Sequence, residues 1–245
     1  MYLLRNLDYS ITDHCNLKCE NCGTFSPYKP KKFVNINTFT DDIGRISARF
    51  TLKNFKLFGG EPLLHPQLTQ ILFTSRKNLT DTEIILISNG VNFAKLQPAV
   101  FRSLHILDIR LDISRYNIKV DYDQIQKICE QYSIRCSISE CKKEFMDFVD
   151  TTGSVNPVEI FDICQKSFSC PEYYNGKIYS CGYAKDSAFL NATNKLDKQA
   201  VDDGEAISKS DDVLYNYLNT PRPTCRFCTC NTKMKPWRQI AMPCV

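Results

Sequence analysis

Three cysteines within eight residues near the N-terminus constrain this chain more than any other feature. Cys15, Cys19 and Cys22 follow the spacing C-x3-C-x2-C, directly after a strand-like segment. Three thiolates on one short loop can each bind one iron of a cubane cluster, which leaves the fourth iron open for an exogenous ligand. Unconnected thiols and a zinc knuckle are the alternatives, but His14 is adjacent to Cys15 and makes a poor fourth zinc ligand. The triad therefore indicates an iron–sulfur cluster with chemistry at its open position.

The cysteine content and the charge of the chain narrow the class of protein. The chain has 13 cysteines in 245 residues, and ten of them lie beyond residue 128. No signal peptide or membrane-length apolar run is visible, so we expect a cytoplasmic protein with no membrane partner. In a reducing compartment, dense cysteines indicate metal binding more than disulfides. The net charge of +4 is too mild for a nucleic-acid partner to be expected.

Strand-like and helix-like segments alternate over the first 140 residues, which predicts βαβ units, a parallel sheet and an α/β fold. About five such units are visible, fewer than the eight of a closed barrel. From about residue 150 the periodicity weakens and cysteines gather, so we place a domain boundary near 150–160. The expected strands are 7–12, 54–58, 83–88, 104–114 and 133–139, and the expected helices are 38–50, 67–77, 93–101 and 121–132.

Two short motifs follow the second and third expected strands, at the strand ends where barrel active sites gather. They read GGEP at residues 59–62 and SNG at residues 88–90. Either motif alone would be only a turn. Together with the cysteine triad, in this order and one βα unit apart, they resemble the radical SAM superfamily.

This resemblance implies a partial (β/α)6 TIM-like barrel over residues 1–155. It also implies a [4Fe–4S] cluster on the triad and S-adenosylmethionine (SAM), whose methionyl amino and carboxylate groups chelate the open iron. An electron from a donor such as flavodoxin or ferredoxin would cleave SAM to a 5′-deoxyadenosyl radical. Asn21 stands where the family often has an aromatic residue near adenine, so Phe25 or Tyr28 would take that role. The resemblance places these residues at SAM: Gly59, Gly60, Glu61, Ser88, Asn89, Gly90 and Ser114.

Polar residues alternate along the fourth expected strand. Asp108, Arg110, Asp112 and Ser114 stand at every second position. On an inner barrel strand such residues line a cavity or form salt-bridged filling, and both interpretations stay open. The resemblance implies that Ser114 or Arg115 contacts SAM.

A second cysteine constellation lies in the C-terminal part. Cys170 and Cys181 flank an expected β-hairpin with Asn-Gly at its tip, and Cys225 and Cys228 form a C-x2-C pair. Two such pairs brought together by folding give four metal ligands. A zinc ribbon on the same cysteines is the alternative to an iron–sulfur cluster.

The same stretch resembles the auxiliary-cluster domains, of twitch or SPASM type, that follow radical SAM barrels. Their Gly-x4-Cys element is matched by Gly176 and Cys181. The resemblance implies a small cysteine-rich domain over 156–245 with a second, auxiliary [4Fe–4S] cluster. The expected ligands are Cys170, Cys181, Cys225 and Cys228, with Cys164 and Cys230 as close substitutes. Cys129 and Cys136 are interpreted as core residues, and Cys244 is a candidate hydrogen donor of the kind that epimerases use.

An auxiliary cluster favours one-electron oxidation of a substrate radical. We therefore expect a radical SAM oxidoreductase, a dehydrogenase or an epimerase, that acts on a sugar-like or cyclitol small molecule. The layout resembles dehydrogenases of the 2-deoxy-scyllo-inosamine type. A peptide-modifying maturase is the alternative, but a first strand near residue 7 would leave no room for the N-terminal peptide-recognition domain that many of them carry. A glycyl-radical-enzyme activase and a non-enzymatic metal-binding module are weaker alternatives.

Overall fold

The structure is a computed structural model that describes residues 1–167, 169–194, 201–230 and 232–240. Its chain divides into two compact units. The barrel unit comprises Met1–Lys18, Ser26–Lys143 and Gln239–Val245, and the cysteine-rich unit comprises Cys19–Phe25 and Glu144–Arg238. The domain limits 1–155 and 156–245 stay a prediction. Within the described ranges, the structure contains no helix that is both long and apolar enough to span a membrane.

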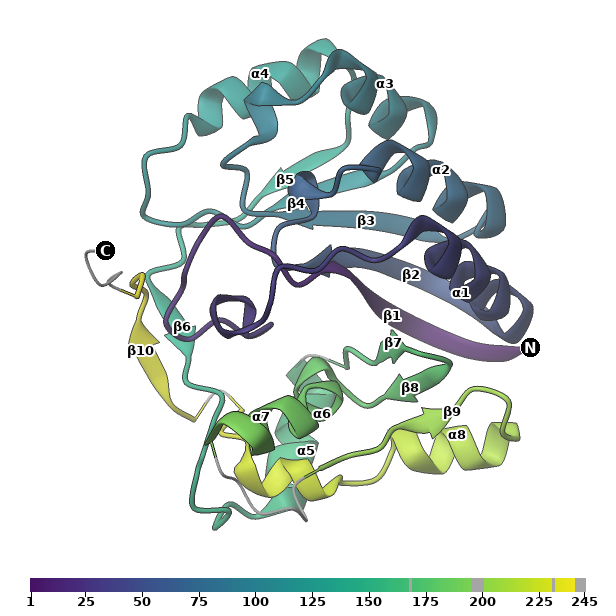
Figure 1. Cartoon of the computed structure of the whole chain (residues 1–245), viewed down its shortest axis with the longest axis vertical. Helices are drawn as coiled ribbons and strands as arrows, with labels where there is room; N and C mark the ends of the chain where they lie inside the picture. The colour runs from purple at the N-terminus through teal and green to yellow at the C-terminus, as the bar shows by residue number, and fades with distance from the viewer. Residues whose placement is uncertain (168, 195–200, 231, 241–245) are drawn as a thin grey trace. The chain divides into compact units, whose positions relative to one another are not determined.

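A parallel sheet forms the centre of the barrel unit, in the order β5-β4-β3-β2-β1 (Figure 1). One row of paired residues crosses all five strands: Tyr9, Leu57, Leu86, Leu111 and Cys136. This arrangement confirms the predicted α/β fold with a parallel sheet, as in a partial TIM-like barrel. The strands are β1 (Tyr2–Thr12), β2 (Phe50–Gly59), β3 (Glu83–Ser88), β4 (Arg110–Ile113) and β5 (Cys136–Ile138).

Four helices lie on one side of this sheet (Figure 1). Phe39, Ile43 and Ile46 have the spacing of one helical face, and all three are fully buried. On β1, Tyr9 points to the same side, since its ring packs edge-on against Phe39 at 5.1 Å and its hydroxyl donates to Asp42. The helices are α1 (Ile36–Arg49), α2 (Leu68–Asn78), α3 (Pro98–Ile106) and α4 (Tyr122–Gln131), and short 3-10 turns lie at Ser26–Tyr28, Pro62–Leu64 and Phe93–Lys95.

The region between β3 and β4 differs from the sequence expectation. The expected helix 93–101 is a 3-10 turn followed by a separate helix, because Pro98 starts α3 and does not interrupt a longer one. Proline lacks an amide hydrogen and has a helical φ, so it fits the first turn of a helix. The expected strand 104–114 begins only at Arg110, since Leu104 is buried within α3 and Asp108 has a φ of +47°.

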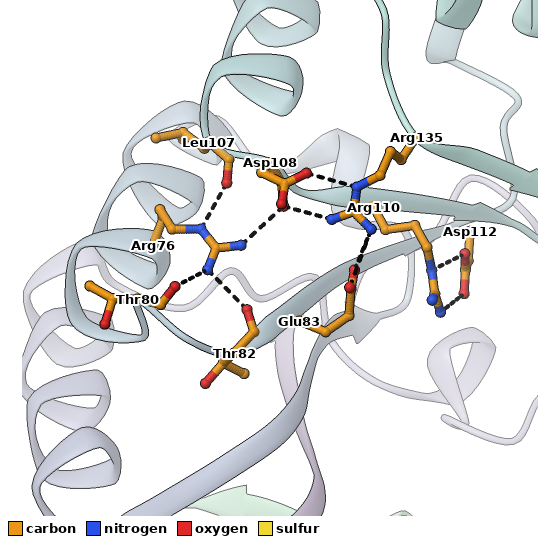
Figure 2. Close-up of polar contacts among 9 residues, drawn as sticks. All are labelled: Arg76, Thr80, Thr82, Glu83, Leu107, Asp108, Arg110, Asp112 and Arg135. Atoms are coloured by element: carbon orange, nitrogen blue, oxygen red, sulfur yellow. Dashed lines mark hydrogen bonds and ion pairs between the residues drawn. The ribbon is translucent and has the colours of Figure 1, made fainter.

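Arg76, at the end of α2, holds two loops of the barrel unit together (Figure 2). Its guanidinium donates to five backbone carbonyls at 2.8–3.1 Å. Nearby, Arg135 bonds Glu83 and Asp108, at the starts of β3 and β4. A planar guanidinium with five donors can satisfy several carbonyls at once, which fixes where the strands begin. The carbonyls bound by Arg76 belong to Leu79, Thr80, Thr82, Leu107 and Asp108.

The cysteine-rich unit contains short elements and the predicted hairpin. Strands β7 and β8 pair antiparallel, and the turn between them has Asn175 and Gly176 with φ of +49° and +76°. Two positive φ values in a two-residue loop suit the twist of a hairpin, which explains the Asn-Gly pair. The strands are β6 (Glu144–Met146), β7 (Glu172–Tyr174), β8 (Lys177–Tyr179), β9 (Glu205–Ala206) and β10 (Met234–Pro236), and the helices are α5 (Pro157–Ser167), α6 (Gly182–Lys185), α7 (Ser187–Asn194), α8 (Asp211–Leu218) and the 3-10 helix η5 (Pro223–Phe227).

Candidate active site

The carboxylate of Glu61 connects the GGEP and SNG motifs in the barrel unit. Its side chain is fully buried and accepts three hydrogen bonds. Oε1 accepts from the Leu63 amide at 3.0 Å and from the Ser88 hydroxyl at 2.7 Å, and Oε2 accepts from the Asn89 amide at 2.8 Å. The ends of β2 and β3 are therefore fixed to each other by one side chain.

Burial raises the pKa of Glu61 to about 7, although its three hydrogen bonds act in the opposite direction. Removing a carboxylate from water disfavours its charged form, and donors that point at it favour that form. Burial has the larger effect here. The Glu61 carboxyl, which joins the GGEP and SNG motifs, consequently gains or loses its charge near neutral pH.

The two glycines of the GGEP motif allow a close backbone approach to the segment before the cysteine triad. A Cβ atom on Gly59 would lie 2.2 Å from the Thr12 carbonyl oxygen, and one on Gly60 would lie 2.2 Å from that of His14. The amides of Gly60 and Glu61 donate to these same carbonyls at 2.7 and 2.8 Å. Any side chain at either position would push β2 away from the end of β1.

The SNG motif also reaches the first cysteine. The Asn89 side-chain amide donates to Asn16 Oδ1 at 2.7 Å and lies 3.7 Å from the Cys15 sulfur. The Leu17 amide donates to that sulfur at 3.4 Å. Ser114 joins the group through its amide, which donates to the Ser88 carbonyl at 2.8 Å. Cys15, the two motifs and Ser114 are thus linked in one network at the carboxyl ends of β1 to β4.

The other two triad cysteines belong to the cysteine-rich unit and also carry donors. Cys19 is 6% exposed, and the Trp237 indole nitrogen donates to its sulfur at 3.3 Å. The Cys22 sulfur lies 3.2 Å from the Thr24 hydroxyl. Donors aimed at sulfur stabilise thiolates and are common around iron–sulfur clusters. The chemistry of this donor set therefore fits the cluster that the triad predicts.

The second constellation is brought together within the cysteine-rich unit. Four other thiols lie close enough to Cys164 for their charge to raise its pKa. Cys225 has the same effect on the pKa of Cys181 and of Cys228. Burial raises the pKa of Cys230, and a side-chain hydrogen bond with Cys164 acts in the opposite direction. The six members of this group, named here the thiol group, are Cys164, Cys170, Cys181, Cys225, Cys228 and Cys230.

Keeping several thiolates together here is unfavourable without a cation. Burial, and then the charge of neighbouring groups, raises the pKa of Cys181 and of Cys228 to about 12, although backbone amides act in the opposite direction. A bound metal cation reverses this balance and deprotonates its thiol ligands. Within the described residues, no three His, Cys, Asp or Glu side chains already stand in the arrangement of a metal site. The donor set fits a thiolate-bound metal, but its four ligands stay a prediction, as does the role of Cys244, which lies outside the described residues.

Several residues of these sites escaped the sequence analysis. Asn16 and Thr24 lie next to the triad but belong to no motif. Trp237 is 218 residues from Cys19 along the chain, and no pattern links the two. The two aromatic residues expected near adenine differ in exposure: Phe25 is buried against Tyr183, and Tyr28 is exposed. His14 packs edge-on against Phe33, as a packing residue would.

Comparison with known proteins gives the same assignment as the motifs. The profile of the Radical SAM superfamily matches residues 9–139, more than half of the chain. A GTP 3′,8-cyclase of Synechocystis is 25% identical over 203 residues, which cover 80% of this chain and 61% of that protein. A GTP 3′,8-cyclase of Klebsiella pneumoniae is 35% identical over 133 residues, 51% of this chain and 40% of that one. Molybdenum cofactor biosynthesis protein 1 of Bos taurus is 29% identical over 109 residues, 43% of this chain and 17% of that protein, so the chain spans only part of these curated relatives.

A solved structure shares the fold over nearly the whole length. BtrN in complex with AdoMet and 2-DOIA superposes with a TM-score of 0.52 and 10% identity, covering 92% of this chain and 93% of that one. At this identity the likeness concerns the fold alone. Family membership implies a [4Fe–4S] cluster and SAM as cofactors. On its matched residues and its fold, this chain belongs to the radical SAM superfamily.

Proposed function

We propose that this chain is a radical SAM oxidoreductase that oxidises or epimerises a sugar-like or cyclitol substrate. Bound at Cys15, Cys19 and Cys22, the cluster would supply the electron that cleaves SAM to methionine and a 5′-deoxyadenosyl radical. The network around Glu61 supports this assignment, because it joins Cys15 to both SAM-binding motifs. We assign SAM contacts to Gly59, Gly60, Glu61, Ser88, Asn89, Gly90 and Ser114.

The sheet face opposite the helices supports a polar substrate. Tyr9 of β1 points to the helices, so Asp8 lies on the other face, where Lys56 pairs with it at 3.4 Å. On β4, Arg110 and Asp112 form a two-bond ion pair on the same face (Figure 2). Hydroxyl groups can exchange hydrogen bonds with such pairs.

The charge balance on this face favours a neutral polyol. Lys56 and Arg110 are each already paired with a carboxylate, so they offer little net positive charge. A triphosphate would require unpaired cations to bind with comparable strength. Arg110 and Asp112 of β4 form an ion pair, and we assign this pair to substrate positioning.

We infer an oxidation because the thiol group could bind a second, electron-accepting cluster. A [4Fe–4S] cluster bound there would accept one electron from the substrate radical. The substrate would lose a hydrogen atom to the 5′-deoxyadenosyl radical, and then one electron and the hydroxyl proton, which converts an alcohol to a ketone. In an epimerisation, the candidate donor Cys244 would give the hydrogen atom of its thiol to the other face of the substrate radical, and the external electron donor, with a proton, would restore the thiol. We keep Cys170, Cys181, Cys225 and Cys228 as the proposed ligands, with Cys164 and Cys230 as substitutes.

A GTP 3′,8-cyclase activity is the second candidate. It is favoured by the names of the curated relatives, of which one covers 80% of this chain. The same barrel unit would then place a nucleoside triphosphate, and its sugar, at the polar face of the sheet. The paired state of Lys56 and Arg110 weighs against this candidate.

Iron and sulfide counting tests the two clusters. The anaerobically reconstituted wild type should hold about eight irons, and the Cys15/Cys19/Cys22→Ala variant about four. Four irons falling to none, with zinc present, would remove the auxiliary cluster from the proposal. Wild type that releases no 5′-deoxyadenosine from SAM with dithionite would contradict radical SAM activity itself.

A substrate panel then separates the two candidates. Reduced enzyme is incubated with SAM and either aminocyclitols and hexoses or GTP, and products are analysed by mass. Loss of two hydrogens from a cyclitol or sugar supports the dehydrogenase. A product formed only from GTP supports the cyclase and overturns the first candidate.

A further inference from the structure

The segment that follows β10 lies along the loop that carries the cysteine triad. In the cysteine-rich unit, the Glu20 amide donates to the Arg238 carbonyl at 3.0 Å, and the two side chains form an ion pair. In the barrel unit, the Ile240 amide donates to the Lys18 carbonyl at 2.7 Å. We name residues 237–240 the strap. Its backbone runs beside the triad loop from Lys18 to Glu20.

One side chain of the strap bonds directly to a triad sulfur. The Trp237 indole nitrogen lies 3.3 Å from the Cys19 sulfur. An indole nitrogen can only donate a hydrogen bond, so the direction of this one is fixed. Cys19 is buried, which shields the bond from competing water.

We propose that Trp237 is a positioning residue that raises the reduction potential of the triad cluster through its hydrogen bond to the Cys19 sulfur. The inference rests on the proposed function, since it requires Cys19 to be a ligand. Reduction adds one negative charge, part of which lies on the ligand sulfurs. A donor aimed at such a sulfur stabilises the reduced form more than the oxidised form, which raises the potential.

The strap offers a matched pair of variants. Trp237→Phe removes the N–H but keeps an aromatic ring at the position. Arg238→Gln breaks the neighbouring ion pair with Glu20 and leaves the indole in place. Because Trp237 is the only tryptophan, replacing all tryptophan with β-(3-benzothienyl)alanine changes this one site and removes only the N–H.

The experiment is a redox titration of the reconstituted full chain, followed by electron paramagnetic resonance. The triad cluster is recognised as the signal that shifts when SAM is added. We expect a more negative midpoint potential in Trp237→Phe and in the benzothienyl protein, and a much smaller shift in Arg238→Gln, where the lost ion pair is exposed and screened by solvent. Iron content in all of them should equal that of wild type.

Each other outcome has a definite meaning. Equal potentials in wild type and the two variants without the N–H would overturn the inference and leave the proposed function intact. Equal shifts in Trp237→Phe and Arg238→Gln would also overturn it, because the strap would then act as a cover and not through its N–H. A wild type without a SAM-responsive signal would instead contradict the proposed function.

Discussion

The surroundings of Cys15 and the thiol group are held together in different ways. Around Cys15, the Glu61 carboxylate accepts hydrogen bonds from Ser88 and Asn89, and the Asn89 side chain donates to Asn16. In the thiol group, by contrast, burial and the charge of neighbouring cysteines both oppose thiolate formation. The surroundings of Cys15 are organised by hydrogen bonds of the polypeptide, and the thiol group collects ligands that need a cation.

This difference indicates where the protein depends on its metal. A site held by its own hydrogen bonds keeps its shape when empty, and one that gathers buried thiols gains much of its stability when metal binds. We therefore expect the barrel unit to fold without clusters and the cysteine-rich unit to require one. Four experiments test this difference between the two regions.

The largest effect is expected on removing metal from the thiol group. Chelation, or the Cys181→Ser/Cys228→Ser variant, should strip amide protection from β7 and β8 while β1 to β3 stay protected. Metal binding to such sites contributes on the order of 10 kcal/mol to folding. Hydrogen exchange by mass spectrometry measures both units in one sample. Cys141→Ser, outside both cysteine sites, is the control, and equal protection of β7 and β8 with and without metal would refute the contrast.

The second effect concerns the protonation of Glu61 in the metal-free protein. Its pKa is about 7 in the folded protein and about 4.5 in the unfolded chain, so the folded state holds the proton more tightly. The stability from this group is complete below pH 4.5 and is lost as the pH rises to 7, by about 3 kcal/mol. Urea unfolding at several pH values should show this slope in wild type and not in Glu61→Gln. Parallel curves for the two proteins would show that the carboxyl stays ionised throughout.

The third effect tests the packing of the barrel unit away from any cofactor. Arg76→Met should lower the free energy of unfolding by about 2 kcal/mol, because five carbonyls lose their shared donor and several regain water. Denaturant unfolding monitored by circular dichroism measures it. Arg102→Met, on the exposed side of α3, should change the stability by less than about 0.5 kcal/mol. An equal loss in both variants would mean that the charge, and not the carbonyl contacts, matters.

The smallest effect is expected at Asn16. Asn16→Ala removes the acceptor of the Asn89 side chain and should cost about 1 kcal/mol, while the fold is kept. Gln70→Ala, in an exposed glutamine pair at the start of α2, is the matched control. If Asn16→Ala and Gln70→Ala change the free energy of unfolding equally, the hydrogen bonds around Cys15 do not stabilise the metal-free protein as we expect.

The sequence predicted those parts of the structure that local patterns control. Strand β3 begins and ends where the apolar run 83–88 does, because a buried parallel strand needs apolar residues on both faces and the following Asn-Gly ends it. The Asn-Gly tip likewise predicted the hairpin of β7 and β8.

Long-range and backbone contacts could not be predicted in this way. The acceptors of Arg76 are carbonyls, which every residue carries and no sequence pattern marks. The bond from Trp237 to Cys19 joins residues 218 positions apart. The apolar pattern of 104–114 suits a strand as well as the end of a helix. The structure shows that a helix, α3, begins at Pro98 and includes the first residues of this stretch.

The strap has a consequence for the order in which the protein is assembled. Its contact between Arg238 and Glu20 joins residues 218 positions apart along the chain. Chains emerge from the ribosome N-terminus first, and contacts of high sequence separation form late. The triad loop should therefore be made, and open to iron delivery, well before the strap packs against it.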